Sequence, residues 1–164
     1  MRDLQKAVNE CLKELDALNI PYSSSCEFVI NHRAKRRWGY CKKIGNSFQI
    51  EINADLLNEK NNYKALKDTI IHELLHTCKG CMNHSEKWKK YAEMLNKKYG
   101  YNIKRTNNAK EKGVTYYHAP PVNYKIQCNV CKKIYSRSRM SKFVSDPSLF
   151  ICSRCHSNDW TRLK

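Results

Sequence analysis

The segment "DTIIHELLHTCKGCMNHSEKW", residues 68–88, concentrates side chains that bind soft divalent metals. Residues four apart lie above one another on a helix, so His72 and His76 can present two imidazoles to one point. Glu73 is offset by one position, which places its carboxylate beside such a metal as a candidate general base. The flanking residues are apolar, and unpaired imidazoles in a core would be costly. The pattern therefore predicts a metal site, with zinc as the expected ion.

The third ligand decides the chemistry of this site. A catalytic zinc normally has three protein ligands and one open position, whereas a structural zinc is closed by four. A turn at Gly80 can bring His84 back toward the first two histidines, giving an open three-histidine site. Cys78 and Cys81 offer a closed alternative with two imidazoles and two thiolates, although Cys78 would have to reach round the same helical turn. Glu93 is a weaker third candidate. We favour His84.

Two CxxC pairs form a second constellation, Cys128 with Cys131 and Cys152 with Cys155, separated by twenty residues. This spacing is typical of a four-thiolate zinc ribbon. The metal would supply folding energy to a segment of about forty residues, which is too short to bury enough apolar surface alone. The sequence therefore predicts two zinc ions, one catalytic and one structural.

The elements that must position these residues follow from periodicity and turn signals. An apolar stripe predicts a helix over residues 3–18, and three short segments, 26–31, 36–41 and 47–53, are typical of strands in a small antiparallel sheet. A second helical pattern runs from Tyr63 to the interruption at Gly80. Together they predict an α+β fold with helices packed on the sheet.

A third helix is expected to start near Ser85 and to end at Gly100, with Asn83 and Glu86 at the spacing of a capping pair. Residues 101–123 show no sustained period and contain two consecutive prolines, which is typical of a linker or wrapping segment. We therefore expect one domain over residues 1–122, including this linker, and the ribbon over residues 123–164.

The formal net charge of the 164-residue chain is +16. Residues 1–31 carry three basic and five acidic side chains, whereas residues 101–164 carry thirteen basic and three acidic ones. A basic excess concentrated toward one end and interleaved with aromatic residues predicts contact with a polyanion, and DNA is the expected partner. A basic protein without such a partner has the same composition. The candidate DNA contacts are Arg33, Lys35, Arg36, Arg37, Lys132, Lys133, Arg137 and Arg139.

The chain contains no apolar run of the length that spans a membrane, and its first ten residues contain no apolar signal core. We therefore expect no membrane partner and a cytoplasmic location, associated with the nucleoid if the source is bacterial. Nine cysteines, an odd number that includes CxxC pairs, favour reduced thiols and metal over disulfides. A monomer is expected.

The order of motifs resembles that of the Spartan-related SprT-like zinc metallopeptidases. "HELLH" is followed by "NHSEKW", preceded by "RAKRRWGYCKKIGNSFQIEIN" and trailed by the ribbon. The resemblance implies a zincin-like fold, zinc ligands at His72, His76 and His84, and a catalytic glutamate at Glu73. It also implies DNA binding and protein substrates presented on DNA, as in DNA–protein crosslink repair.

Two functions are compatible with the sequence. The first is a zinc-dependent endopeptidase that acts on proteins bound or crosslinked to DNA, in which the strand at residues 47–53 could pair with an extended substrate. The alternative is a non-catalytic DNA-binding protein in which both metal sites are structural. Thiolate ligands at the first metal would favour the alternative.

Overall fold

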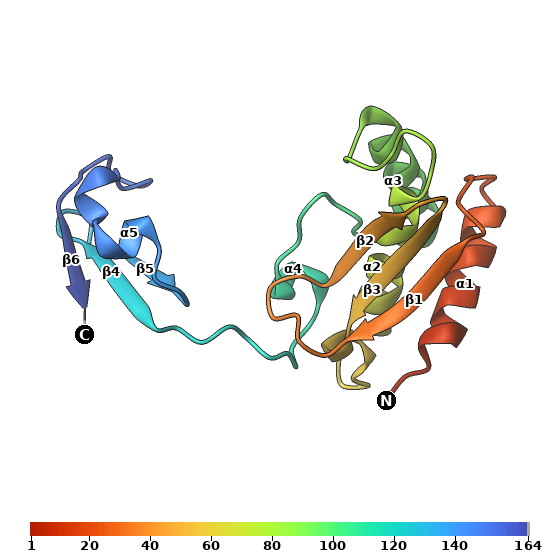
Figure 1. Cartoon of the computed structure of the whole chain (residues 1–164), viewed down its shortest axis with the longest axis horizontal. Helices are drawn as coiled ribbons and strands as arrows, with labels where there is room; N and C mark the ends of the chain where they lie inside the picture. Colours follow the sequence, from red (N-terminus) through yellow and green to blue (C-terminus); the bar gives the residue numbers. More distant parts are fainter. Residues whose placement is uncertain (164) are drawn as a thin grey trace. The chain divides into compact units, whose positions relative to one another are not determined.

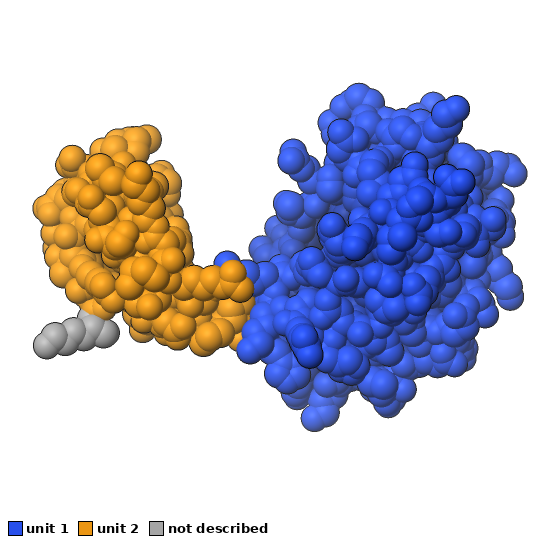
Figure 2. Space-filling view, viewed as in Figure 1, with its two compact units in different colours: residues 1–118 blue, residues 119–164 orange. Residues whose placement is uncertain are grey.

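The structure is a computed structural model that describes residues 1–163 and divides into two compact units, Met1–His118 and Ala119–Lys164 (Figure 2). Both units combine helices with a small three-stranded sheet, so the α+β class predicted from the sequence is confirmed. None of the helices within residues 1–163 has both the length and the apolar character needed to cross a membrane.

The first unit packs its helices against one small sheet (Figure 1). The central helix α2 contacts strands β2 and β3 and also the helices α1 and α3. Its core-facing residues are fully buried aliphatic side chains, which fixes the orientation of the helix that carries the HExxH motif. In chain order the elements are α1 (Leu4–Asp16), β1 (Cys26–Asn31), β2 (Gly39–Ile44), β3 (Ser47–Asn53), the 3-10 helix η1 (Ala54–Leu57), α2 (Tyr63–His76), α3 (Glu86–Tyr99) and α4 (Ala109–Lys112).

The sheet has the strand order β1-β3-β2, in which β2 pairs antiparallel with β3 but β1 pairs parallel with β3. The expectation of an all-antiparallel sheet was therefore wrong for β1. Gly45, at φ 59°, and Asn46 join β2 to β3 as a tight hairpin. The longer connection at residues 32–38 leads from β1 to β2 without pairing these two strands. The place beside β1 is therefore left for β3.

The strand expected at residues 36–41 begins only at Gly39. The side chain of Asn53 explains the shift, because its Nδ2 donates to the carbonyl oxygens of Ala34, at 2.8 Å, and Arg37, at 3.1 Å. These bonds hold the preceding residues as a loop. Helix α3 is capped by Ser85, whose hydroxyl accepts from the Trp88 N–H, so the capping pair expected at Asn83 and Glu86 was also wrong.

Residues 101–118 return to the first unit. Tyr101, Ile103 and Val114 join its hydrophobic core, and the side chain of Asn61 accepts hydrogen bonds from the backbone of Thr115, at 2.9 Å, and of Tyr116, at 2.8 Å. Residues 101–118 of the segment without periodicity are therefore structurally part of the unit that contains the histidines, and residues 119–123 belong to the second unit.

The second unit is a three-stranded antiparallel sheet with the order β5-β4-β6. Among its described residues, the hydrophobic core cluster holds three buried side chains, Ile126, Phe143 and Val144. A core of this size stabilises a fold weakly, so the unit depends on further crosslinks. Its elements are β4 (Tyr124–Cys128), β5 (Ile134–Arg137), α5 (Lys142–Ser145), the 3-10 helix η2 (Pro147–Leu149) and β6 (Trp160–Leu163).

Candidate metal centre

Three imidazoles converge at the C-terminal end of α2. His72 and His76 lie one helical turn apart, and the loop after the helix delivers His84, whose Nε2 lies 3.1 Å from His72 Nε2. One donor atom from each histidine lies within 4.8 Å of the others. Zn–N bonds are about 2.0–2.1 Å long, so a single ion can reach all three donors. The donor set fits zinc in a site with three protein ligands.

The loop between α2 and α3 is held in the shape that His84 needs. Gly80 has φ 82°, a left-handed conformation that residues other than glycine rarely adopt. Its carbonyl accepts a hydrogen bond from the Ser85 hydroxyl at 2.8 Å. His76 Nδ1 lies 2.9 Å from the Cys81 carbonyl oxygen. An imidazole that donates from Nδ1 leaves Nε2 for a metal.

The structure keeps the two loop cysteines out of this donor group. Cys78 Sγ donates to the Pro21 carbonyl at 2.6 Å, and Cys81 is fully buried. Burial raises the pKa of Cys78 to about 12, so the protein holds a thiol there instead of the thiolate that zinc requires. Glu93 is exposed on α3 and is not part of the group either.

The electrostatics of the site keep the histidines neutral. Burial, followed by the neighbouring His76 and His84, lowers the pKa of His72 to about 3. Burial also lowers the pKa of His76 and of His84. Neutral imidazole is the form that binds a metal, so the three side chains are ready as ligands at neutral pH. The ring of Trp88 contacts all three histidines.

Glu73 is buried between the helix and the start of β2. Burial raises its pKa to about 8, and the charge of Lys112, a backbone hydrogen bond from Cys41 and the charge of Arg37 act in the opposite direction. Gly39 lies so close that an added Cβ would come within 2.5 Å of Glu73 Oε1. The glycine of the "RRWG" segment therefore makes room for the carboxylate.

A cavity of about 270 Å³ opens beside Glu73 and His72. Sequence reasoning missed part of its wall, because Lys104, Arg105, Asn107 and Lys112 come from the segment without a periodic signal. The backbone of Lys104 also forms a hydrogen bond with His72, as the Cys81 carbonyl does with His76. The lining residues are Arg36, Arg37, Trp38, Gly39, Thr69, His72, Glu73, Lys104, Arg105, Thr106, Asn107 and Lys112.

The second candidate metal site is the group of Cys128, Cys131, Cys152 and Cys155 in the second unit. Cys128 Sγ lies 3.4 Å from Cys155 Sγ, and Cys131 Sγ lies 3.5 Å from Cys152 Sγ. A backbone hydrogen bond from Cys131 lowers the pKa of Cys128, which favours the thiolate. The donor set fits a four-thiolate zinc site with no open position.

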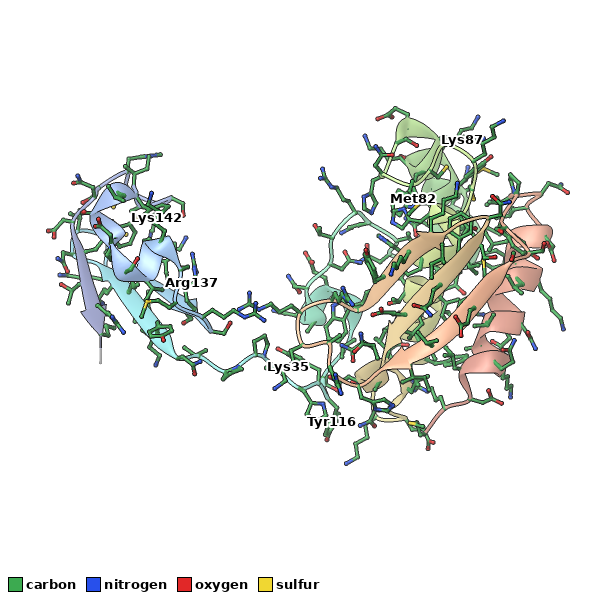
Figure 3. All side chains as sticks on the ribbon, in the orientation of Figure 1. Lys35, Met82, Lys87, Tyr116, Arg137 and Lys142 are labelled. Atoms are coloured by element: carbon green, nitrogen blue, oxygen red, sulfur yellow. The ribbon has the colours of Figure 1, made fainter. Side chains whose placement is uncertain are left out.

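The eight candidate DNA contacts are all exposed, four before β2 and four in the second unit. Figure 3 labels one of each group, Lys35 and Arg137. Several have partners: Arg37 Nη2 lies 2.6 Å from Glu51 Oε2, Lys133 Nζ lies 4.9 Å from the Tyr135 ring centroid, and Arg137 lies 5.1 Å from that of Phe143. Arg36 and Arg37 line the cavity beside Glu73.

A helix that carries HExxH beneath the edge of a small sheet, with a third histidine from the following loop, defines a zincin-like domain of the metallopeptidase type. Residues 4–108, more than half of the chain, match the family model of the SprT-like family, and the chain belongs to that family. A comparison with curated proteins finds no match.

Proposed function

We propose that this protein is a zinc-dependent endopeptidase that acts on proteins bound or crosslinked to DNA. The observation that carries the proposal is the position of Glu73, a buried carboxylate adjacent to a three-histidine group and to the cavity. A purely structural zinc site does not require a buried carboxylate beside its ligands. The exclusion of Cys78 and Cys81 from the donor set argues against the alternative in which both sites are closed.

The roles of the residues follow from their positions. His72, His76 and His84 would hold the zinc, which when bound polarises a substrate carbonyl and lowers the pKa of a water molecule. Glu73 is placed to accept a proton from the attacking water and to deliver it to the leaving amine. The low exposure of Glu73 keeps bulk water away from this proton.

An extended peptide has one suitable strand edge near this site. The expectation that β3 pairs with substrate was wrong, because β3 is central and its two neighbours use its hydrogen-bonding groups. β2 is an edge strand, it packs on α2, and its first residue lies against Glu73. A peptide added to β2 would pass directly over the candidate site.

DNA contact is supported by charge. The chain has a net charge of +16, and exposed basic residues occur before β2 and throughout the second unit. Binding that depends on phosphate contacts weakens steeply with salt. In this proposal DNA brings substrate and protease together, so proximity contributes to the choice of protein, and crosslinked proteins are the substrates that remain in place longest.

The test is the Glu73→Gln variant. Loss of the general base should lower cleavage by about 10²- to 10⁴-fold, while the zinc content measured by elemental analysis stays that of the wild type. The matched control is Glu93→Gln, which makes the same change at an exposed position and should leave zinc and cleavage unchanged.

The substrate should be a protein covalently linked to an oligonucleotide, compared with the same protein alone. Faster cleavage of the linked form supports the proposal. Wild-type cleavage by Glu73→Gln would refute Glu73 as the general base and with it the proposed mechanism, and equal cleavage of linked and free protein would refute the role of DNA.

A further inference from the structure

The cavity beside Glu73 is strongly cationic. The loop before β2, the helix α2 and the segment at residues 104–112 form its walls. Glu73 is the only acidic side chain among the described residues that line it. Five lining residues carry positive charge: Arg36, Arg37, Lys104, Arg105 and Lys112.

Arg37 and Lys112 already have acidic partners. Arg37 pairs with Glu51, and Lys112 Nζ lies 3.4 Å from Asp68 Oδ2 in a nearly buried pair. Lys104 and Arg105 are exposed and form no ion pair within residues 1–163. The cavity therefore offers positive charge that the protein itself does not neutralise.

A second observation distinguishes between ligands. Asn107 lines the same cavity and donates from Nδ2 to the Asn102 carbonyl at 2.8 Å, while its Oδ1 atom is buried without a hydrogen-bond partner among the described residues. A ligand that brings an N–H group would give this acceptor a partner once the Asn107 side chain turns toward the cavity. A peptide carries N–H groups and acidic side chains close together, whereas a nucleic acid carries its N–H donors on the bases, apart from the anionic phosphates.

The position of the cavity along β2 indicates which part of a peptide would enter it. Gly39 marks the level of Glu73 on this strand, and the cavity extends toward residues 36–38. In an antiparallel pair, earlier residues of one strand face later residues of the other. A peptide paired antiparallel with β2 would therefore direct the residues that follow the cleaved bond toward the cationic wall.

We propose that this cavity binds an aspartate or glutamate side chain on the C-terminal side of the cleaved peptide bond. The inference rests on the proposed peptidase function and adds a substrate preference to it. A volume of about 270 Å³ is below the usual range of about 300–1,000 Å³ for drug-sized ligands, which suits one side chain better than a nucleotide.

The experiment is digestion of a degenerate peptide library by the full-length zinc-loaded protein, with the cut sites mapped by mass spectrometry. Aspartate and glutamate should be enriched about tenfold over asparagine and glutamine just after the cut, the scale of a charge-assisted hydrogen bond. Arg105→Glu should abolish this enrichment and favour lysine or arginine there. Arg105→Lys should retain it, and so should Lys110→Glu, an equal charge change at an exposed residue outside the cavity.

The possible failures are distinguishable. Cleavage without an acidic preference, or a preference unchanged in Arg105→Glu, overturns the inference and leaves the peptidase intact. If no peptide is cut, the proposed function fails. Fluorescence anisotropy then measures the binding of labelled GGEGG and GGQGG peptides, which tests the cavity without cleavage. Equal binding of the two peptides overturns the inference. If Arg105→Glu weakens binding of a single-stranded oligonucleotide but not of GGEGG, the cavity recognises phosphate and the inference is also wrong.

Discussion

The two candidate metal sites differ in how much of the surrounding fold is held together without a metal. The three-histidine group lies on a helix already fixed by an extensive aliphatic core, and its surroundings include a buried carboxylate and a cavity. The four-cysteine group lies in a unit whose core cluster holds three buried residues among those described, and its sulfur atoms lie in two close pairs, 3.4 Å and 3.5 Å apart. A fold that is stable without its metal can leave one coordination position open for chemistry. A structural zinc is instead closed by four protein ligands.

The largest expected effect is the loss of a ribbon thiolate. Cys152→Ser should unfold the second unit, because structural zinc contributes on the order of 10 kcal/mol to folding such domains. The first unit should stay folded and keep its zinc, so elemental analysis should show loss of the ribbon ion alone, and limited proteolysis should cut only after residue 118. Loss of both ions would show that the units are not independent and would break the comparison.

The next effect concerns the open site. His84→Ala should remove the zinc of the first unit, with an affinity loss greater than the roughly 10- to 100-fold that an outer hydrogen-bond partner contributes. The fold should survive, because the core of this unit does not include His84.

The control for His84 is the double variant Cys78→Ser and Cys81→Ser. These buried thiols act as packing groups, so we expect a stability cost of about 1–2 kcal/mol and an unchanged zinc content. Zinc loss in the double variant instead of in His84→Ala would mean that the first site is also closed, and would favour the non-catalytic alternative.

A smaller effect should separate metal binding from catalysis. Gly39→Ala places a Cβ within 2.5 Å of Glu73 Oε1, so the carboxylate must move, at a cost of about 1–3 kcal/mol. Cleavage should fall while zinc content remains unchanged. Gly45→Ala is the contrast, since its Cβ meets no atom within 4 Å but its φ of 59° is strained. It should lose stability and keep its specific activity; an equal activity loss in both variants would trace the effect to the hairpin.

The most gradual expected effect is a pH dependence of the stability of the zinc-free first unit. The folded protein holds the proton of Glu73 up to a pKa of about 8, whereas the unfolded chain releases it near the usual 4.5. Between these values the folded state binds the extra proton, so this residue lowers stability by up to about 1.4 kcal/mol for each pH unit gained. The low pKa of His72 acts in the opposite sense between about 3 and 6.5, where stability rises with pH.

Glu73→Gln should therefore stabilise the chelated protein more at pH 8 than at pH 5. Hydrogen exchange of α2 amides, followed by mass spectrometry, measures this unit alone. Glu93→Gln, at an exposed position, should show no such pH-dependent difference. A constant difference across this range would mean that Glu73 is already ionised in the folded protein without its metal.

Much of this protein is determined by local sequence. Helical periodicity and the glycine stop signals predict α1, α2 and α3 to within a few residues, because those signals lie close to the residues they organise. The same holds for the pairing of His72 with His76, and for the spacing of the two CxxC pairs. The chemistry of each donor set could therefore be inferred without coordinates.

Tertiary structure decided the rest. The parallel pairing of β1 with β3 depends on how the chain crosses between strands, and nothing local in residues 26–31 specifies it. The orientation of the Cys78 thiol depends on its hydrogen bond to the carbonyl of Pro21, a residue far away in the sequence. The cationic wall beside Glu73 comes from residues 104–112, which reach the cavity only because Tyr101, Ile103 and Val114 bury their side chains in the core. Contacts between residues far apart in the sequence place such residues, and the periodicity of a short segment does not depend on those contacts.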